Sequence, residues 1–177
     1  RDLNRSGLPL RIFSGLECDI RRDGEMDLSE DALAELDIVV ASVHSHMNLE
    51  AAEMTDRLMR ALESPSVRIM GHPTGRMLLN REAFPFDFER VATDAARRNV
   101  FLEINASPER LDLSGAMVRT AKGLGCKFAI NTDSHQTKHL GINMPFGVLT
   151  ARRGWLEARN VLNALPLPEF EKAIAKS

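Results

Sequence analysis

Residues 129–135 read AINTDSH, and this stretch decides the fold class. An apolar run with the length of a strand stops abruptly at Asp133 and His135, two side chains that commonly bind metals. Strands that are apolar almost throughout are typical of a parallel sheet covered on both faces. The stretch therefore predicts a buried strand whose last residues carry chemistry, and similar strands should occur elsewhere in the chain.

Similar apolar runs alternate with amphipathic stretches of helix length. The predicted strands are residues 10–15, 38–43, 67–70, 100–104, 128–131 and 146–150. The predicted helices are residues 29–35, 49–64, 87–99, 114–124, 156–162 and 168–175. Asn48 and Ser114 are the expected N-caps of the second and fourth helices. Alternating strands and helices predict a parallel sheet with crossover helices, either doubly wound or closed as a barrel.

Polar side chains recur at or just beyond the ends of five consecutive predicted strands. Roughly 30 residues apart, the length of one βαβ unit, lie Glu17, His44, His72, Glu103 with Asn105, and Asp133 with His135. A β/α barrel brings the C-terminal ends of all its strands to one mouth, whereas a doubly wound sheet converges fewer strands at its switch point. Five such ends favour the barrel. A full eight-stranded barrel takes about 250 residues, so we expect an α/β, TIM-like barrel that is incomplete, with about six strands.

Composition excludes several classes of protein. The 177 residues suffice for one sizeable core, and 44% hydrophobic with 27% charged residues is the balance of a soluble globular protein. No apolar run predicts a membrane span and no signal-peptide pattern is expected, while Cys18 and Cys126 are expected to be buried thiols in a reducing cytoplasm. The net charge of −2 lacks the basic footprint of a stand-alone nucleic-acid-binding domain.

The strand-end residues suit a divalent metal. The candidate ligands are Glu17, His44, His72, Asp133 and His135. Imidazole together with carboxylate suits Zn²⁺, Mn²⁺ or Fe²⁺, and a set without thiolate is typical of a catalytic rather than a structural site. Structural interpretations also stay open: an ion-paired carboxylate for Glu17, a core histidine for His44, and a turn-forming Asp133 with a hydrogen-bonded His135.

Polar and positively charged residues follow the same strand ends. The candidates for binding a substrate are His46, Arg76, Asn105, Arg110 and Lys138. Arg and Lys beside a metal-rich mouth suit an anionic substrate such as a phosphate, although a loop or helix-face charge explains each of them as well. The acidic residues after the first strand do not have the spacing of an EF-hand, so we interpret them as a solvated turn. They are Asp19, Asp23, Glu25 and Asp27.

A series of motifs along the chain resembles a known family. In order, they are GLECDI, VVASVHSHMN, MGHPTGR, LEINASPERLDLS, INTDSH and GVLTARRGWLEARNVLN. The series resembles the later part of a PHP (polymerase and histidinol phosphatase) domain, in the version found at the C-terminus of bacterial family-X DNA polymerases. The resemblance implies that residues 1–177 are the later part of a single distorted (β/α)7 barrel. It also implies phosphoester hydrolysis with up to three Mn²⁺ or Zn²⁺ ions.

The resemblance assigns roles to individual positions. Glu17 matches a metal-bridging glutamate, His44 and His72 match ligands after the next two strands, and Asp133 and His135 match a terminal Asp-x-His pair. Among them, Glu17, His44 and Asp133 are expected to be catalytic. The family also has a His-x-His strand and further ligands before the equivalent of Arg1, so fewer ions are expected in this segment.

The resemblance also implies a biological setting. It predicts 3′-5′ exonuclease and abasic-site or 3′-end-processing activity in DNA repair, with DNA 3′ ends or another phosphoester as the substrate. A polymerase domain is expected upstream in the same cytoplasmic chain. Two alternatives stay open: a small-molecule phosphatase of the histidinol-phosphatase type, and a structural or DNA-positioning domain without activity.

Overall fold

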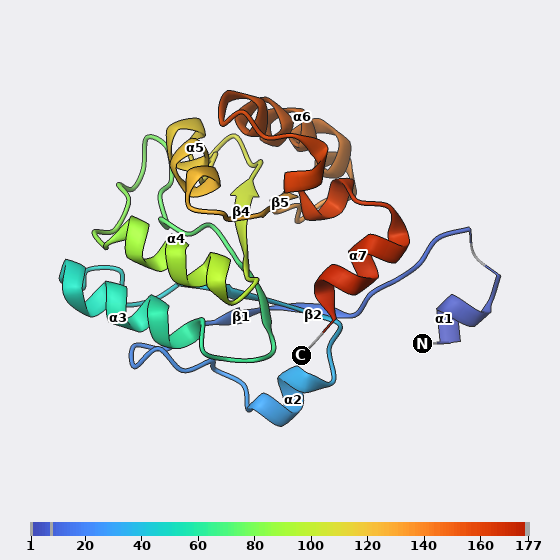
Figure 1. The fold of residues 1–177 in the computed structure, drawn as a ribbon, viewed down its shortest axis with the longest axis horizontal. Helices are drawn as coiled ribbons and strands as arrows, with labels where there is room; N and C mark the ends of the chain where they lie inside the picture. The colour runs from blue at the N-terminus through green and yellow to red at the C-terminus, as the bar shows by residue number, and fades with distance from the viewer. Residues whose placement is uncertain (1, 8, 176–177) are drawn as a thin grey trace.

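A computed structural model describes residues 2–7 and 9–175 as a mixed α/β fold (Figure 1). The strands are β1 (Gly15–Asp19), β2 (Ile38–Ser42), β3 (Val67–Met70), β4 (Phe101–Asn105) and β5 (Phe128–Asn131). The helices are α1 (Asp2–Arg5), α2 (Glu30–Ala34), α3 (Ala51–Ala61), α4 (Phe88–Arg97), α5 (Gly115–Gly123), α6 (Thr137–Arg153) and α7 (Leu167–Ile174), with 3₁₀ turns η1 (Ala158–Asn160) and η2 (Leu162–Ala164). No helix among the described residues has the length and apolar character needed to cross a membrane.

The five strands form one parallel sheet whose spatial order is the chain order, β1-β2-β3-β4-β5. Each crossover therefore steps in the same direction, which is the winding of a barrel, and the order does not reverse as it does in a doubly wound sheet. The sheet is not closed, since β1 and β5 do not pair with each other in the described residues. The predicted parallel α/β sheet is thus confirmed, while closure into a barrel stays a prediction.

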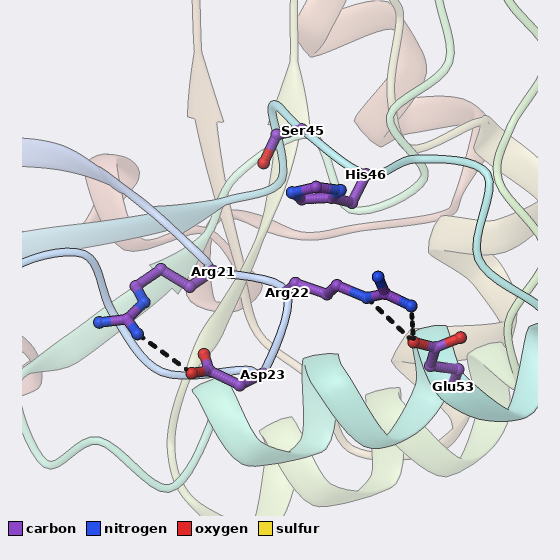
Figure 2. Close-up of a pocket in the computed structure, with 6 residues that line it drawn as sticks. All are labelled: Arg21, Arg22, Asp23, Ser45, His46 and Glu53. Atoms are coloured by element: carbon purple, nitrogen blue, oxygen red, sulfur yellow. Dashed lines mark hydrogen bonds and ion pairs between the residues drawn. The ribbon is translucent and has the colours of Figure 1, made fainter.

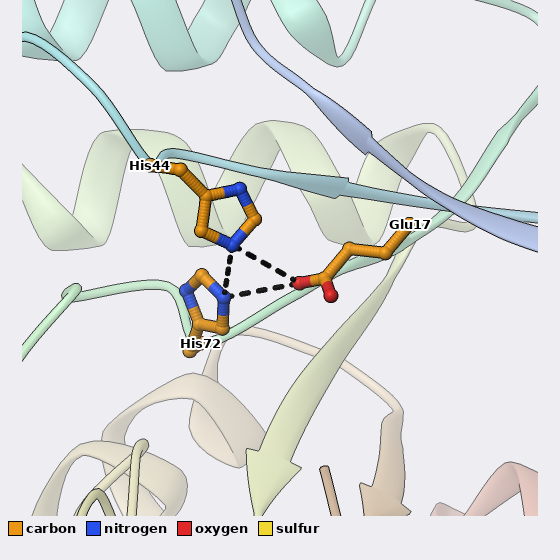
Figure 3. Close-up of side chains that lie close together, drawn as sticks. All are labelled: Glu17, His44 and His72. Atoms are coloured by element: carbon orange, nitrogen blue, oxygen red, sulfur yellow. Dashed lines mark hydrogen bonds and ion pairs between the residues drawn. The ribbon is translucent and has the colours of Figure 1, made fainter. Parts of the chain in front are cut away.

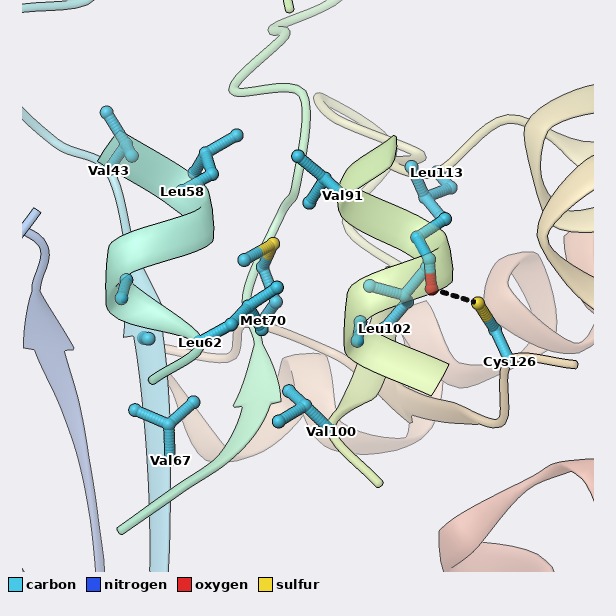
Figure 4. Packing of buried hydrophobic residues seen from close by; sticks show 14 of the residues in the cluster. Val43, Leu58, Leu62, Val67, Met70, Val91, Val100, Leu102, Leu113 and Cys126 are labelled. Atoms are coloured by element: carbon cyan, nitrogen blue, oxygen red, sulfur yellow. Dashed lines mark hydrogen bonds between the residues drawn. The ribbon is translucent and has the colours of Figure 1, made fainter. Parts of the chain in front are cut away.

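Helices cover one face of the sheet and bury the larger core. In Figure 1, α3, α4 and α5 follow one another along one side of the molecule, as expected for successive right-handed crossovers. Figure 4 shows Leu58 of α3 and Val91 of α4 packed around Met70 and Leu102 of the strands beneath them. All four side chains are buried, so this layer fixes the strands that carry the polar residues on their other face.

The other face of the sheet is divided along the strand direction. Towards the N-terminal ends of the strands, Ile69, Phe101 and Ala129 form a second apolar cluster with η2 and α7. Towards the C-terminal ends the residues on this face turn polar, because side chains two positions apart on a strand share a face. Two residues beyond Phe101 comes Glu103, and two beyond Ala129 comes Asn131. The helix α7 therefore covers the N-terminal part of this face, and the C-terminal ends of the strands carry a polar rim.

The sequence misplaced four features. The first strand is Gly15–Asp19 rather than residues 10–15, so Glu17 lies inside β1 and not beyond its end. Residues 146–150 belong to α6, whose large apolar side chains face outward while small or polar ones face the core, so their apolar run imitated a strand. Residues 156–162 form 3₁₀ turns instead of a helix. The N-cap of α3 is Glu50 and not Asn48, whereas Ser114 caps α5 as predicted by accepting from Met117 N.

Candidate metal centre

Glu17, His44 and His72 come together at the C-terminal ends of three neighbouring strands (Figure 3). Glu17 lies on β1, whereas His44 and His72 each follow the end of the next strand, β2 or β3, by two residues. Each residue offers one ligand atom, and the three atoms lie within 4.8 Å of one another. Parallel strands in chain order thus bring together residues that lie far apart in the sequence.

The three side chains point at a common centre. His72 Nε2 lies 3.0 Å from Glu17 Oε1 and 3.2 Å from His44 Nε2, and His44 Nε2 lies 3.6 Å from Glu17 Oε1. Ser42 donates its hydroxyl to Glu17 Oε1 at 2.7 Å. The hydrogen bond from His72, and less strongly the one from Ser42, lowers the pKa of Glu17 to about 2 although partial burial opposes this. Glu17 is therefore a carboxylate at any physiological pH.

His72 is the buried member of the group, with 2% of its surface exposed. Burial is the largest single influence and disfavours its protonation, but the hydrogen bond with Glu17 and the negative charges of Glu103 and Glu17 together outweigh it, so the pKa of His72 is raised. In the absence of an ion, one of the two facing Nε2 atoms must carry a proton, because two acceptors cannot lie 3.2 Å apart without one. These three atoms would be the ligands of a bound divalent cation, and imidazole with carboxylate is a donor set that suits such an ion.

Asp19 orients His44 and was missed by the sequence analysis. Its Oδ1 is paired with His44 Nδ1, which leaves Nε2 facing Glu17 and His72. A carboxylate on the other ring nitrogen fixes the tautomer and direction of a metal-binding histidine. The interpretation of Asp19 as part of a solvated turn was wrong. The available signal was its position two residues after Glu17, which puts both side chains on one face of β1.

Glu103 holds the loop that carries His72. It is buried, and its Oε2 accepts the backbone N–H of His72 at 2.6 Å and the amide of Asn105 at 3.3 Å. Its Oε1 accepts the amide of Asn131 at 2.7 Å. Burial raises the pKa of Glu103, and these hydrogen bonds oppose the shift. The structure thus places Glu103 directly behind the site, in contact with the backbone of His72.

The structure does not bring Asp133 and His135 into the same tight group among the described residues. Asp133 Oδ2 accepts from Asn105 Nδ2 at 3.1 Å and from Arg110 Nε at 3.3 Å. Asn105 therefore links Asp133 to Glu103, and through Glu103 to the backbone of His72. The His135 side chain is 86% exposed, and its Nδ1 lies 3.0 Å from the carbonyl oxygen of Asp133. Asp133 thus borders Asn105 at the rim, whereas the contacts of His135 are with Asp133.

The predicted substrate-binding residues lie in different environments. His46 and Lys138 are exposed, Asn105 is fully buried, and Arg110 is mostly covered by its ion pair with Asp133. His46 borders an open surface hollow of about 510 Å³, facing Arg22, which is paired with Glu53 (Figure 2). The other lining residues are Arg21, Asp23 and Ser45.

Arg76 is engaged with the protein itself. Its Nε donates to the carbonyl of Arg110 at 3.0 Å, and its Nη2 donates to the carbonyl of Leu111. The guanidinium therefore joins the loop after β3 to the loop after β4, and in this arrangement two of its donors are already satisfied.

Comparison with known proteins identifies relatives of this chain. The chain is 40% identical over 175 residues, 99% of its length, to the DNA polymerase/3′-5′ exonuclease PolX of Bacillus subtilis. The resemblance to the PHP part of a family-X polymerase is confirmed. Probable phosphatases of Shewanella oneidensis and Thermoanaerobacter sp. are 34% and 30% identical over 139 and 142 residues, 73% and 75% of the chain. No family model matches the chain.

The chain corresponds to a part of these relatives. It spans 30% of the length of PolX and 53% and 56% of the lengths of the two phosphatases. Exonucleases and phosphatases both hydrolyse phosphoesters, so this chemistry is what the names of the relatives have in common. The Glu17, His44 and His72 group lies within the segment matched to PolX.

Proposed function

We propose that this chain is the metal-dependent phosphoesterase part of a longer PolX-type protein, acting on DNA 3′ ends during repair. The proposal rests on one observation above all: two imidazole nitrogens and one carboxylate oxygen lie within 4.8 Å of one another at the strand ends. The 40% identity to PolX supports the substrate class, and a polymerase domain elsewhere in the longer chain is part of the proposal.

In this proposal Glu17, His44 and His72 hold a divalent Mn²⁺ or Zn²⁺ ion, and Asp133 with His135 supplies further ligands at the same rim. A bound ion of this kind lowers the pKa of water and stabilises negative charge on phosphoryl oxygens. Asp19 keeps Nε2 of His44 directed at the ion site. Lys138, exposed just beyond His135, is placed to attract the phosphate.

The charge of the segment bears on how DNA would be held. With a net charge of −2 this segment has no excess of positive charge, and phosphate contacts supply most of the affinity of proteins for DNA. We therefore propose that the remainder of the longer chain binds the DNA and that this part hydrolyses it. High salt should then weaken DNA digestion far more than hydrolysis of a small phosphoester.

The test compares variants of the intact protein. Glu17→Gln and His72→Gln should remove Mn²⁺-dependent digestion of a 5′-labelled DNA strand and lower the bound metal measured by elemental analysis. His139→Gln is the matched control, because His139 lies in the first turn of α6 and outside the metal group. DNA digestion that persists in both site variants would refute the proposal, provided that the wild-type protein is active in the same assay.

A second candidate function is a small-molecule phosphatase, favoured by the 34% identity to a probable phosphatase over 139 residues. The same metal group would serve both activities, so variants of Glu17 cannot separate them. Turnover of p-nitrophenyl phosphate against turnover of a DNA 3′ end, measured with the wild-type protein at equal metal concentration, does separate them. A preference for the monoester over DNA would favour the phosphatase.

A further inference from the structure

His72 differs from His44 in having no partner on its second ring nitrogen. His72 Nδ1 is buried and makes no hydrogen bond within the described part of the chain, whereas His44 Nδ1 is paired with Asp19. Metal-binding histidines usually have their second nitrogen held by a carboxylate, a carbonyl or water. Because only the Nε2 side of the ring is held by side chains, the direction of the His72 ring also depends on the backbone that carries it.

That backbone adopts an unusual conformation. His72 has φ 25°, in the region that residues with a Cβ rarely adopt, and Gly75 has φ 64°. Such a conformation persists only where the surroundings hold it. On one side, Glu103 accepts the N–H of His72 itself at 2.6 Å. On the other side, two residues further on, Asp112 Oδ2 accepts the N–H of Thr74 at 3.0 Å.

Asp112 is unusually placed for a carboxylate. It has no exposed surface, and its Oδ1 is buried without a hydrogen-bond partner among residues 2–7 and 9–175. Burial raises the pKa of its carboxyl group, although Thr74 and, at longer range, Arg76 and His72 oppose this. Burying a carboxylate is costly unless hydrogen bonds compensate it. An apolar residue would fill this position without that cost, so the carboxylate of Asp112 must contribute something besides packing.

The loop that carries Asp112 is itself fixed against the loop that carries His72. Arg76 donates to the carbonyl groups of Arg110 and Leu111, and Leu78 N donates to the carbonyl of Glu109 at 2.6 Å. Asn105 N donates to the carbonyl of Asp112 at 2.5 Å. The two loops are therefore joined as one unit. Asp112 contacts the end of β4 through its carbonyl and Thr74 through its carboxylate, so it holds residues 72–74 at a fixed position relative to β4.

We propose that Asp112 is the positioning residue of His72: it fixes the backbone at Thr74 and thereby directs the His72 ring at Glu17 and His44. Asp19 orients His44 by pairing with its ring, whereas Asp112 would orient His72 by holding the backbone that carries the ring. The proposal rests on the proposed function in that His72 is a metal ligand. Its structural part, the control of the ring direction by Asp112, holds with or without metal.

The test uses two variants of the intact protein that separate hydrogen bonding from size. Asp112→Asn keeps an oxygen that can accept from Thr74 N, whereas Asp112→Leu keeps the branched shape, with bulkier ends, but accepts nothing. Asp94→Asn is the matched control, because Asp94 is also buried, is ion-paired with Arg97 and Arg98, and lies on α4 away from the metal group. The Asp94→Asn variant tests whether destabilisation of the fold by itself affects the site.

The first readout is the pair of ¹⁵N signals of the His72 ring in metal-free, ¹⁵N-histidine-labelled protein, assigned with His72→Gln. The second is the dissociation constant for Mn²⁺ and for Zn²⁺, each measured alone. We expect Asp112→Leu to move the His72 signals and to weaken metal binding by about 10-fold or more. Asp112→Asn should stay within about threefold of wild type, and Asp94→Asn should change neither readout.

Two results would overturn the proposal: unchanged His72 signals in folded Asp112→Leu, or equal losses in Asp112→Asn and Asp112→Leu. If Asp112→Leu does not fold, the same measurements on Asp112→Ala decide, with the same expectations. A wild-type protein that binds no divalent ion would instead refute the proposed function. The ring signals of the metal-free protein would still show whether Asp112 directs His72, so the two failures are distinguishable.

Discussion

The two histidines of the metal group belong to halves of the site that are built differently. On the β1–β2 side, Glu17, Asp19 and His44 are partly exposed and are held by contacts between side chains. On the β3–β4 side, His72 and Glu103 are buried and are held by hydrogen bonds to backbone and amide groups. The exposed half can change without disturbing the core, whereas the buried half is part of it.

This difference separates the effect of a substitution on stability from its effect on metal binding. Exposed ion pairs contribute about 0–1 kcal/mol to stability, whereas a buried donor left without an acceptor costs about 1–3 kcal/mol. Substitutions on the exposed side should therefore affect ligand binding and leave folding almost unchanged. Substitutions on the buried side should reduce both, and the two halves can be distinguished by measuring stability and metal affinity on the same variants.

The largest effect is expected at Glu103. Glu103→Ala removes the acceptor of three donors, the N–H of His72 and the amides of Asn105 and Asn131. With these groups left unsatisfied, the free energy of unfolding should fall by about 3 kcal/mol. Urea unfolding followed by circular dichroism measures the change.

Glu53→Ala is the control for Glu103→Ala. Glu53 is ion-paired with Arg22 at 3.1 Å, with 47% of the Glu53 side chain and 62% of the Arg22 side chain exposed. Its loss should cost less than about 1 kcal/mol. If Glu103→Ala costs no more than Glu53→Ala, the contrast between a buried and an exposed half is wrong.

Gly71, between the two halves, should show the next largest effect. A Cβ at this position would overlap Ser42 Oγ and come within 2.8 Å of Val40 Cγ1. Since Ser42 donates to Glu17, Gly71→Ala should displace both the hydroxyl and the carboxylate and cost about 2 kcal/mol. Thermal unfolding and Mn²⁺ titration should both change, and an unaltered Mn²⁺ affinity would show that Ser42 does not matter for the position of Glu17.

The sequence predicted the buried half of the sheet better than its exposed edge. Strands 67–70 and 128–131 were found with their bounds because continuous apolar runs coincide with strands buried on both faces. At β1 the pattern failed, since Leu16 is exposed and the polar residues Glu17 and Asp19 lie on the strand itself. Because β1 lies at the edge of the open sheet, fewer neighbouring elements cover its side chains, and the apolar run that marks an inner strand is missing.

The candidate site divides in the same way. The meeting of His44 with His72 follows from parallel strands in chain order, which the spacing indicated. Asp112 had no such signal, because its role depends on how the loop after β4 folds back onto residues 72–74. Contacts between loops depend on turn geometry that local sequence patterns do not specify, so these residues could be found only in three dimensions.

A smaller effect is expected at Asp19, on the exposed side. Asp19→Ala should weaken Mn²⁺ or Zn²⁺ binding by about 10-fold, because His44 loses the carboxylate that orients it. Stability should change by less than about 1 kcal/mol, as for other exposed pairs. Isothermal titration and thermal unfolding measure the two quantities, and Asp23→Ala, which breaks an exposed pair with Arg21, is the control. A large loss of stability would place Asp19 with the buried half.

The smallest effect, and the most direct comparison of the two histidines, concerns the titration of Glu17. The hydrogen bond from His72 is the largest cause of its low pKa of about 2, and the charge of His44 is the smallest. In metal-free protein, His72→Gln should therefore raise the pKa of Glu17 towards its ordinary value of 4.5 much more than His44→Gln does. The ¹³C signal of the Glu17 carboxyl group, followed from pH 2 to pH 6, reports both shifts.

The sign of the accompanying stability change follows from the same comparison. The pKa of Glu17 is lower in the folded than in the unfolded chain, so between about pH 4.5 and pH 2 the unfolded chain binds more protons. The contribution of Glu17 to stability is therefore complete above about pH 4.5. It is lost as the pH falls towards about 2. Solvent reaches much of the Glu17 side chain and screens the effect, so it should be small. The acid-induced loss should be reduced in His72→Gln and largely kept in His44→Gln. Equal shifts in the two variants would mean that the buried and the exposed histidine act on Glu17 alike.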